Sequence, residues 1–429
     1  MSAYDATDVF TPTGVPTLTY VYRQDQDLES HLRAAVRTPG MIVSLSGPSK
    51  SGKTVLIRKV IPEEDLISVS GGSLTSPEQL WDRVLSWMEA PSETTTRTAT
   101  TVGGEAGGRG TVSAGVSFLA KGEIEGSGKL TGSRLSEKSE KRGRSGIDQV
   151  VSEIANSSFI VFIDDFHYMA PDVQTAVSRQ IKEVAEKGVK VCTASVPHRS
   201  DDVVRSNPEL RGRVQAIDFY YWSDDDIRQI ATQGFAALGI IVPAEFIDQL
   251  VKEAFGSPQL MQGMCLQTCF QFDVEQTKYP PIAYSIDESR MRKILEQTSS
   301  TTDFSTLLET LHTGPKSRGM DRNQYQFYDG SAGDVYRCVL LALKTNPPAL
   351  TFRYDEIIAR TKVICSGNSP SGSSVSEALL QMDKLSAAVQ PGSKIIEWDD
   401  DVLDISDPYF LFYLRCSPRI GKIRSPGAS

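Results

Sequence analysis

The residues with the most specific chemistry in this sequence form one run of eight, Gly47-Pro48-Ser49-Lys50-Ser51-Gly52-Lys53-Thr54. Two glycines separated by four residues and followed by Lys-Thr fit the phosphate-loop pattern. The glycines let the backbone curl, so that successive N–H groups and the next helix N-terminus can hold a di- or triphosphate. Lys53 would bring a positive charge to the β- and γ-phosphates, and the Thr54 hydroxyl is placed to ligate Mg²⁺. We therefore predict that all eight residues bind a nucleotide with magnesium.

A second group of candidates stands at the end of an apolar run. Residues 159 to 163 are all apolar, and Asp164 and Asp165 follow directly. A central parallel strand has this composition, and its carboxyl end would present both acids beside the phosphate loop. Asp164 would then hold the magnesium shell, and Asp165 would orient or deprotonate the attacking water. By itself such a run is usually a plain strand end, but its position after a clear phosphate loop favours the catalytic interpretation.

Other side chains could contact the nucleotide, and the sequence patterns that indicate them are less specific. Tyr22 and Arg23 could cradle the adenine, although an ordinary strand end with a solvent-facing arginine is equally consistent with the sequence. Thr193 or Ser195, near the end of another apolar run, would lie level with the γ-phosphate. Pro258, in Gly-Ser-Pro, would open a helix packed toward the nucleotide.

Two arginines form a further catalytic candidate. Arg211 and Arg213 lie on a segment between two expected strands. They could stabilise phosphate charge on an adjoining subunit, or they could pair with nearby acids on the surface. The sequence supports both interpretations evenly.

The elements that must position these residues alternate between strand and helix. Short apolar runs predict strands at 41–45, 66–70, 159–165, 189–195 and 215–220. Helical spacing predicts helices near 28–36, 54–59, 76–88 and 172–187. This alternation is typical of an α/β fold with a parallel sheet. Residues 91–146 interrupt it, since they are rich in glycine and end in a basic run at 138–144. They predict an exposed hairpin between 112 and 125, serving either as a functionless insertion or as a contact for a partner.

The full domain organisation follows from these patterns and from changes in composition. We expect an N-terminal arm (1–19), an ATPase-type core with its insertion (20–222), a wholly helical lid (223–310), a linker (311–330) and a winged-helix-like α+β domain with a closing helix (331–429). The arm could be extended or form a loose cover over the nucleotide site.

Composition limits the choice of partners. A chain of 429 residues with a net charge of -9 and a pI near 5.2 does not bind nucleic acid over its whole surface. The six cysteines form no CxxC pair, so neither zinc nor a disulfide framework is indicated. No apolar run approaches the ~20 residues of a membrane span, which predicts a cytoplasmic location.

The expected winged-helix-like domain is acidic where a DNA reader would be basic. Its third helix, 373–389, carries Lys384 against Glu377 and Asp383, and further acids surround the expected wing at Glu397, Asp399, Asp400, Asp401 and Asp404. DNA phosphates would be repelled. The charge pattern therefore favours protein docking or nucleotide sensing over DNA binding.

Together these residues resemble the AAA+ and STAND branch of P-loop ATPases, especially the Orc/Cdc6-like and archaeal-ATPase groups. The resemblance covers roughly residues 20 to 300 and rests on 47–54, 159–165, 193–199, 208–213 and 256–258, of which only the first two are specific. It implies ATP and Mg²⁺ as cofactors, with Lys53, Thr54, Asp164 and Asp165 at the phosphates and metal, and Arg211 or Arg213 acting between subunits. The chain departs from AAA+ proteins in having no sensor arginine at 256–270 and no asparagine at the first sensor position.

The resemblance implies three functional hypotheses. The first is an ATP-driven switch whose nucleotide state controls homo-oligomer assembly or binding of a protein partner. The second is a DNA-engaging initiator or transposition-helper ATPase that uses the basic part of the insertion, 121–144. The third is a nucleotide-stabilised scaffold with little hydrolysis.

Overall fold

The computed structural model describes residues 3–89, 93–99, 137–143, 146–196, 210, 212–316, 322–389 and 394–423. All structural statements below concern these residues. The hairpin expected between 112 and 125, the basic side chains of 121–144 and Arg211 lie outside them.

A parallel sheet forms the centre of the N-terminal half, which confirms the predicted fold class. Its order is β2-β5-β6-β1-β7, and the strands are β1 (Ile42–Ser46), β2 (Leu66–Ser70), β5 (Ile160–Asp164), β6 (Lys190–Ser195) and β7 (Val214–Asp218). Ser46 at the end of β1 is level with Ser195 on β6 and Asp218 on β7. The carboxyl ends of these strands therefore share one edge of the sheet.

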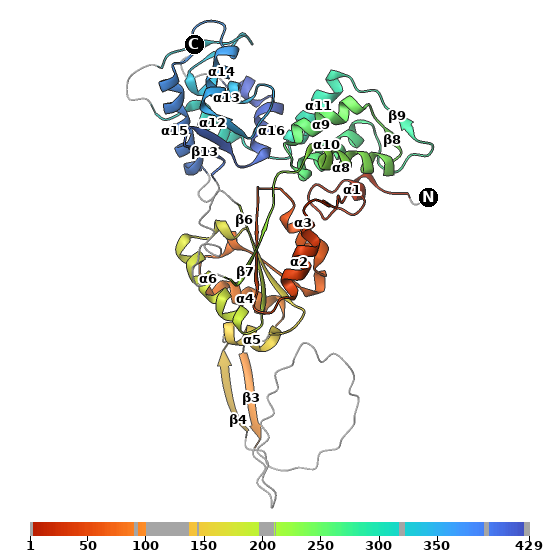
Figure 1. The fold of residues 1–429 in the computed structure, drawn as a ribbon, viewed down its shortest axis with the longest axis vertical. Helices are drawn as coiled ribbons and strands as arrows, with labels where there is room; N and C mark the ends of the chain where they lie inside the picture. Colours follow the sequence, from red (N-terminus) through yellow and green to blue (C-terminus); the bar gives the residue numbers. More distant parts are fainter. Residues whose placement is uncertain are drawn as a thin grey trace, which may run out of the picture.

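Helices cover both faces of this sheet, because apolar residues of the strands point to both sides. The two helical layers consist of α2 (Leu28–Arg37) and α3 (Lys53–Val60) on one face, and α4 (Glu78–Trp87), α5 (Ile147–Ile154) and α6 (Pro171–Glu186) on the other. Val43 packs with the first layer and Ile42 with the second. This three-layer arrangement fixes the strand ends that carry the candidate site (Figure 1).

The insertion begins and ends as a two-stranded antiparallel ribbon. Strands β3 (Glu93–Ala99) and β4 (Glu137–Gly143) pair along their whole length, with Glu93 opposite Gly143 and Ala99 opposite Glu137. The ribbon projects from the end of the molecule opposite the helical lid (Figure 1).

The lid is a helical layer with one departure from the expected all-helical composition. Its helices are α8 (Asp224–Ala237), α9 (Ala244–Ala254), α10 (Pro258–Gln271) and α11 (Glu288–Ser299). Two short strands, β8 (Ile240–Ile241) and β9 (Ile282–Ala283), pair in parallel between them. The expectation of a wholly helical segment was therefore wrong at these residues, whose run of two was too short to give a strand pattern.

The C-terminal domain has the predicted winged-helix-like α+β composition. Helices α13 (Val335–Leu343), α14 (Tyr354–Ile364) and α15 (Gly372–Val389) pack with a sheet of order β12-β14-β13 made from β12 (Thr351–Arg353), β13 (Ile396–Asp399) and β14 (Val402–Ile405). Strand β12 was not predicted from the sequence. Helix α12 (Ser305–Thr313) packs on α13 and α15, so the residues on both sides of the expected boundary at 310 belong to one helix.

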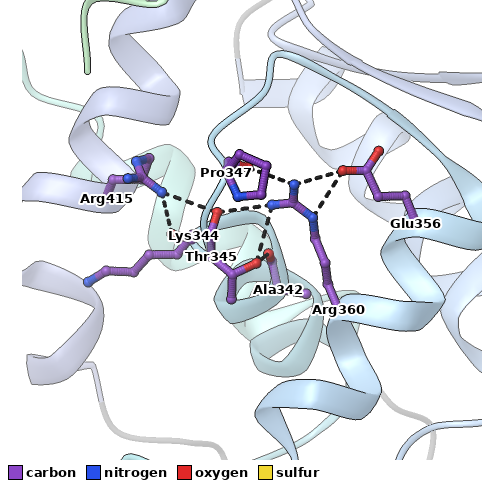
Figure 2. Close-up of polar contacts among 7 residues, drawn as sticks. All are labelled: Ala342, Lys344, Thr345, Pro347, Glu356, Arg360 and Arg415. Atoms are coloured by element: carbon purple, nitrogen blue, oxygen red, sulfur yellow. Dashed lines mark hydrogen bonds and ion pairs between the residues drawn. The ribbon is translucent and has the colours of Figure 1, made fainter. Parts of the chain in front are cut away.

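A polar network connects this domain to the lid. Beyond the end of α13, the Thr345 carbonyl accepts hydrogen bonds from Arg360 Nη1 (2.9 Å) and from Arg415 Nη1 (3.3 Å), as Figure 2 shows. Arg415, on α16 (Pro408–Cys416), also pairs with Glu253 of lid helix α9 at 2.6 Å. One arginine thus joins the lid to the end of a winged-helix-like helix.

No helix of the described part of the chain combines the length and apolar character that a membrane crossing requires. The six cysteines are free thiols, and all except the partly buried Cys416 are buried.

Candidate functional site

A cavity of about 410 Å³ is lined by residues at the carboxyl edge of the sheet, in the lid and in the winged-helix-like domain. The phosphate-loop residues from Ser49 to Thr54 line it, together with Asp164 and Asp165 at the end of β5. Pro258 at the start of lid helix α10 lines it from the opposite side. The fold therefore brings together candidates that are separated by about two hundred residues in the sequence.

The loop wraps closely around the Lys53 ammonium group. Lys53 Nζ donates to the carbonyl oxygens of Gly47 and Pro48, both at 2.8 Å. Gly52 has φ +98°, which is in the left-handed region that glycine adopts without a steric cost. Gly47 lies against Phe219, the residue that follows β7, since a Cβ on Gly47 would sit 2.3 Å from the Phe219 Cβ atom. Glycine is thus required at both positions for geometric reasons.

Burial changes the acidity of the loop lysine. The pKa of Lys53 is lowered to about 8, chiefly because burial removes water from the ammonium group, while Asp164 and Asp165 oppose that shift. An incoming phosphate would replace both the lost water and the two loop carbonyls. The lysine is therefore placed to bind an anion.

The magnesium candidates are in direct contact. Thr54 Oγ1 donates to Asp164 Oδ2 at 2.7 Å, and the backbone N–H of Asp165 donates to Asp164 Oδ1 at 3.0 Å. Both atoms of the first contact are hard oxygen donors, as Mg²⁺ prefers. The uncapped N-terminus of α3 faces the same cavity and suits a phosphate. These residues fit a magnesium nucleotide.

Asp165 combines a left-handed backbone conformation with a raised pKa. Its φ is +55°, and a Cβ on Gly71 would lie 2.6 Å from the Asp165 carbonyl oxygen, so the turn after β5 is closely packed. Its pKa is raised, first by loss of water around the carboxyl group and second by the charge of Asp164. A carboxylate with a raised pKa beside the phosphate loop can accept a proton from water.

Aromatic rings and one buried arginine line the cavity next to the phosphate loop. The Arg23 guanidinium lies 4.7 Å from the centroid of the Trp222 ring and 5.5 Å from that of Phe219. The Trp222 indole also donates to the Ser51 carbonyl at 2.9 Å. Arg23 Nη1 is buried and has no hydrogen-bond partner in the described chain. Arg23 is thus placed where a polar ligand group could meet it.

Tyr22 is a correction to the expected site. Its side chain is 46% exposed and its hydroxyl donates to Asp27, so it does not line the cavity. Tyr20 lines the cavity instead, and its hydroxyl bonds to Glu29. The two tyrosines are separated by one residue, and the sequence offers no signal for which of them faces inward.

The sensor candidates lie beside the cavity without lining it. Thr193 is buried within β6, where its hydroxyl donates to the Val43 carbonyl at 3.5 Å. The Ser195 carbonyl accepts from the Gly47 N–H at 3.3 Å, and Val196, the next residue, lines the cavity. Ser195 therefore supports the phosphate loop through its backbone.

Arg213 lies at the opposite edge of the sheet from the phosphate loop, because it precedes the first residue of β7. Its Nη2 atom is 3.1 Å from Glu186 Oε1. The pairing with a nearby acid that the sequence left open is thus present within the chain. A role on a neighbouring subunit stays a prediction.

The N-terminal arm, for which the sequence left open a cover over the nucleotide site, contributes Thr11 to Pro16 to the cavity. The lining residues of the winged-helix-like domain had not been identified from the sequence, and they are Lys394, Glu397, Ser406 and Asp407. Asp407-Pro408 is a typical helix start, since Asp407 Oδ1 accepts the Tyr409 N–H at 2.9 Å. That capping signal was readable in the sequence, but the position of the cap over the phosphate loop was not.

Comparisons with known proteins agree with the fold. No model of a protein family matches the sequence, and no curated protein matches it significantly. Among solved structures, the Walker-type ATPase PABY2304 of Pyrococcus abyssi matches with a TM-score of 0.51 and 15% identity over 93% of this chain and 100% of that one. The ORC2 protein of Aeropyrum pernix matches with a TM-score of 0.48 and 9% identity over 98% of each chain.

The sheet, the phosphate loop and the match to a Walker-type ATPase agree with one another. The chain shares the fold of that Walker-type ATPase, a parallel-sheet P-loop NTPase core with a helical lid and a winged-helix-like C-terminal domain.

Proposed function

We propose that this chain binds ATP with magnesium, hydrolyses it, and uses its nucleotide state to control assembly or binding of a protein partner. The observation that carries the proposal is the 2.7 Å contact between Thr54 and Asp164, which joins the phosphate loop to the end of β5 beside Lys53. Magnesium, when bound, would neutralise charge on the β- and γ-phosphates. Lys53 would hold the phosphates, and Asp165 would orient the attacking water and accept a proton from it.

A switch also requires that nucleotide binding change the conformation of parts of the chain outside the α/β core. The lid, the arm and the winged-helix-like domain all line the nucleotide cavity, so each can respond to its contents. Ligands shift a conformational equilibrium only by their differential affinity for its states. The shared cavity supports the proposal because all three parts lie beside the position at which ATP and ADP would differ.

The charge of the winged-helix-like domain argues against the DNA-engaging alternative. Asp399 at the end of β13 and Asp400 and Asp401 in the turn that follows are exposed. Glu377 and Lys384 are both exposed on α15. DNA phosphates would meet more negative than positive charge on this surface. We therefore favour a protein partner or a second copy of this chain.

Light scattering and phosphate release together test the proposal. ATP with Mg²⁺ should increase the mass of the wild type, and Lys53→Ala should abolish nucleotide binding, growth and turnover. Asp165→Asn should bind ATP and release little phosphate. Lys187→Ala, an exposed lysine on the far side of the core, is the matched control and should behave as wild type.

Each result has a distinct meaning. Wild type that binds no nucleotide would refute the ATPase assignment altogether. A constant monomer that turns over ATP would exclude assembly and leave partner binding. Normal ATP-dependent assembly in Asp165→Asn with negligible turnover in the wild type would favour the nucleotide-stabilised scaffold.

A further inference from the structure

Helix α15 presents one face to its own domain and the opposite face to solvent. The helix packs on α12, α13 and β13, and its buried side chains are Val375, Ala378, Leu379, Met382 and Ser386. Figure 1 shows α15 at the side of the C-terminal domain that faces away from the lid. The exposed face of α15 is therefore open to another molecule.

The exposed residues of α15 form one continuous stripe. They recur at intervals of three and four residues, as one face of an α-helix requires, and they are Ser373, Glu377, Leu380, Lys384, Ala387 and Ala388. Leu380 lies in the middle of the stripe and is 42% exposed. A single exposed leucine is ordinary on a protein surface, so the residues on either side of it decide what this stripe can bind.

Opposite charges flank the leucine. Glu377 and Lys384 are seven residues apart, which is about two helical turns and about 10 Å along the helix axis. At that separation the two side chains do not pair with each other. Within the described part of the chain, neither side chain forms a hydrogen bond or an ion pair with any other residue. The stripe thus offers one unpaired acid and one unpaired base.

Small side chains occupy the two ends of the stripe. Ser373 lies one turn before Glu377, and Ala387 and Ala388 lie about one turn after Lys384. Small residues let two helices approach closely, because the distance between helix axes depends on the side chains at the contact. When the helix is turned end to end, the order of small residue, charge, leucine, charge and small residue is kept while the two charges exchange places.

We propose that the exposed stripe of α15 binds the same stripe of a second copy of this chain, with the two helices antiparallel about a twofold axis at Leu380. Glu377 then meets the partner's Lys384, and Lys384 meets the partner's Glu377, as a self-complementary interface requires. Leu380 packs on the partner's Leu380, which removes apolar surface of both from water. Ser373 faces the partner's Ala388. A parallel arrangement would instead bring like charges together.

The size of the stripe sets the strength of this dimer. One pair of 18-residue helices buries less than the about 1,600 Å² of a standard interface, so dimerisation should be weak and depend on protein concentration. Surface ion pairs add little affinity, but they fix orientation and the choice of partner. None of the stripe residues lines the nucleotide cavity. The pairing is therefore separate from the proposed nucleotide switch, and Lys53→Ala should dimerise as the wild type does.

Analytical ultracentrifugation of the full chain without nucleotide tests the pairing. The wild type should pass from monomer to dimer as its concentration rises. Leu380→Glu should weaken dimerisation by at least about tenfold, because two like charges would meet at the twofold axis. Val363→Glu is the matched control, since it changes an apolar side chain that is 72% exposed on α14, outside the stripe, and it should dimerise as the wild type does.

Exchange of the two charges tests the antiparallel orientation. Glu377→Lys alone places lysines opposite lysines, and Lys384→Glu alone places acids opposite acids, so each variant should dimerise at least about tenfold more weakly than the wild type. Mixing the two variants should restore association as a heterodimer, because each stripe then carries charge of a single, opposite sign. A variant that failed to fold could not be rescued in this way.

Three results would overturn the inference. They are a wild type that stays monomeric at every concentration, a dimer that Leu380→Glu leaves intact, and a mixture of the two charge variants that does not associate. None of them would affect the proposed function, because nucleotide binding is measured separately.

Discussion

Lys53 illustrates how much of the site depends on single residues. Two carbonyl oxygens of its own loop take the place of water as hydrogen-bond acceptors for its ammonium group, and the loop closes around it. This contact holds the loop in a shape that has room for phosphate. The same burial leaves the lysine with a lowered pKa, which connects nucleotide binding to pH.

Nucleotide binding should take up protons above about pH 8, because Lys53 has a pKa of about 8 in this structure and a phosphate would raise it. Affinity should accordingly fall as pH rises through this region, by up to about tenfold per pH unit. Calorimetry in two buffers of different ionisation enthalpy measures the uptake. Constant affinity from pH 7 to about pH 9.5 would show that Lys53 keeps its proton throughout.

Gly47 should tolerate no side chain. Gly47→Ala would place a Cβ 2.3 Å from the Phe219 Cβ and 2.9 Å from its carbonyl oxygen, so the loop or β7 must shift. We expect a loss of about 1–3 kcal/mol in the free energy of unfolding. Gly421→Ala, where a Cβ meets nothing within 4 Å, is the control in urea unfolding. Equal stability of the two variants would mean that the close approach is easily relieved.

At this scale the sequence predicted residues fixed by a local motif and missed those fixed by distant packing. The phosphate loop and the acids after β5 follow from short patterns whose chemistry requires contiguous residues. Tyr20 and Tyr22 are alike in type and local context, so only the fold distinguishes them. Asp407 could be recognised as a helix cap, but not as part of the nucleotide cavity.

At the scale of elements, the junction between lid and winged-helix-like domain depends on two arginines with different surroundings. Arg360 is bound within its own domain, to Glu356 and to carbonyls of the loop after α13 (Figure 2). Its guanidinium group also lies over the Phe352 ring. Arg415 reaches across to Glu253 of the lid, and both of these side chains are largely buried. The first stabilises a domain, and the second joins two domains.

Arg415→Ala should therefore lower the free energy of unfolding by about 3–5 kcal/mol, because Glu253 would remain buried without its partner. Arg419→Ala breaks an exposed pair with Glu309 nearby and should cost about 0–1 kcal/mol. Urea unfolding of both variants checks the difference. A double-mutant cycle with Glu253→Gln that shows no coupling would contradict the proposed link.

The sequence predicted most elements and misplaced a few for identifiable reasons. Apolar runs of five or six residues between helical segments identified the sheet strands, because a strand that is buried on both faces consists mostly of apolar residues. Strand β12 spans three residues after two prolines, which is too short for a visible alternation. The end of α12 was assigned to a linker, since Gly314 and Pro315 follow it directly.

At the scale of the molecule, the N-terminal arm connects lid and cavity. Phe10 is fully buried and packs edge-on against Phe235 of α8, with ring centroids 5.3 Å apart. The Thr11 N–H donates to Gln262 of α10 at 3.1 Å. The following residues up to Pro16 line the cavity, so the arm is anchored in the lid while it covers the nucleotide site.

Phe10→Ala should release the arm. We expect the free energy of unfolding of the lid to fall by about 3–5 kcal/mol and nucleotide affinity to fall with it. Thr7→Ala, an exposed position on the short helix α1 (Ala6–Val9), is the control. Urea unfolding and nucleotide titration measure the two effects. Reduced stability with unchanged affinity would show that the arm contributes to folding alone.

The register of β3 and β4 has a consequence for how this fold can be engineered and diversified. Ala99 pairs with Glu137, so the chain leaves the ribbon and returns to it at one point. Joining those two residues with a tight turn, or with an unrelated domain whose ends lie close together, would preserve the path of the core. Such an exchange would leave the candidate nucleotide site at the other end of the molecule unchanged, since the ribbon projects away from it.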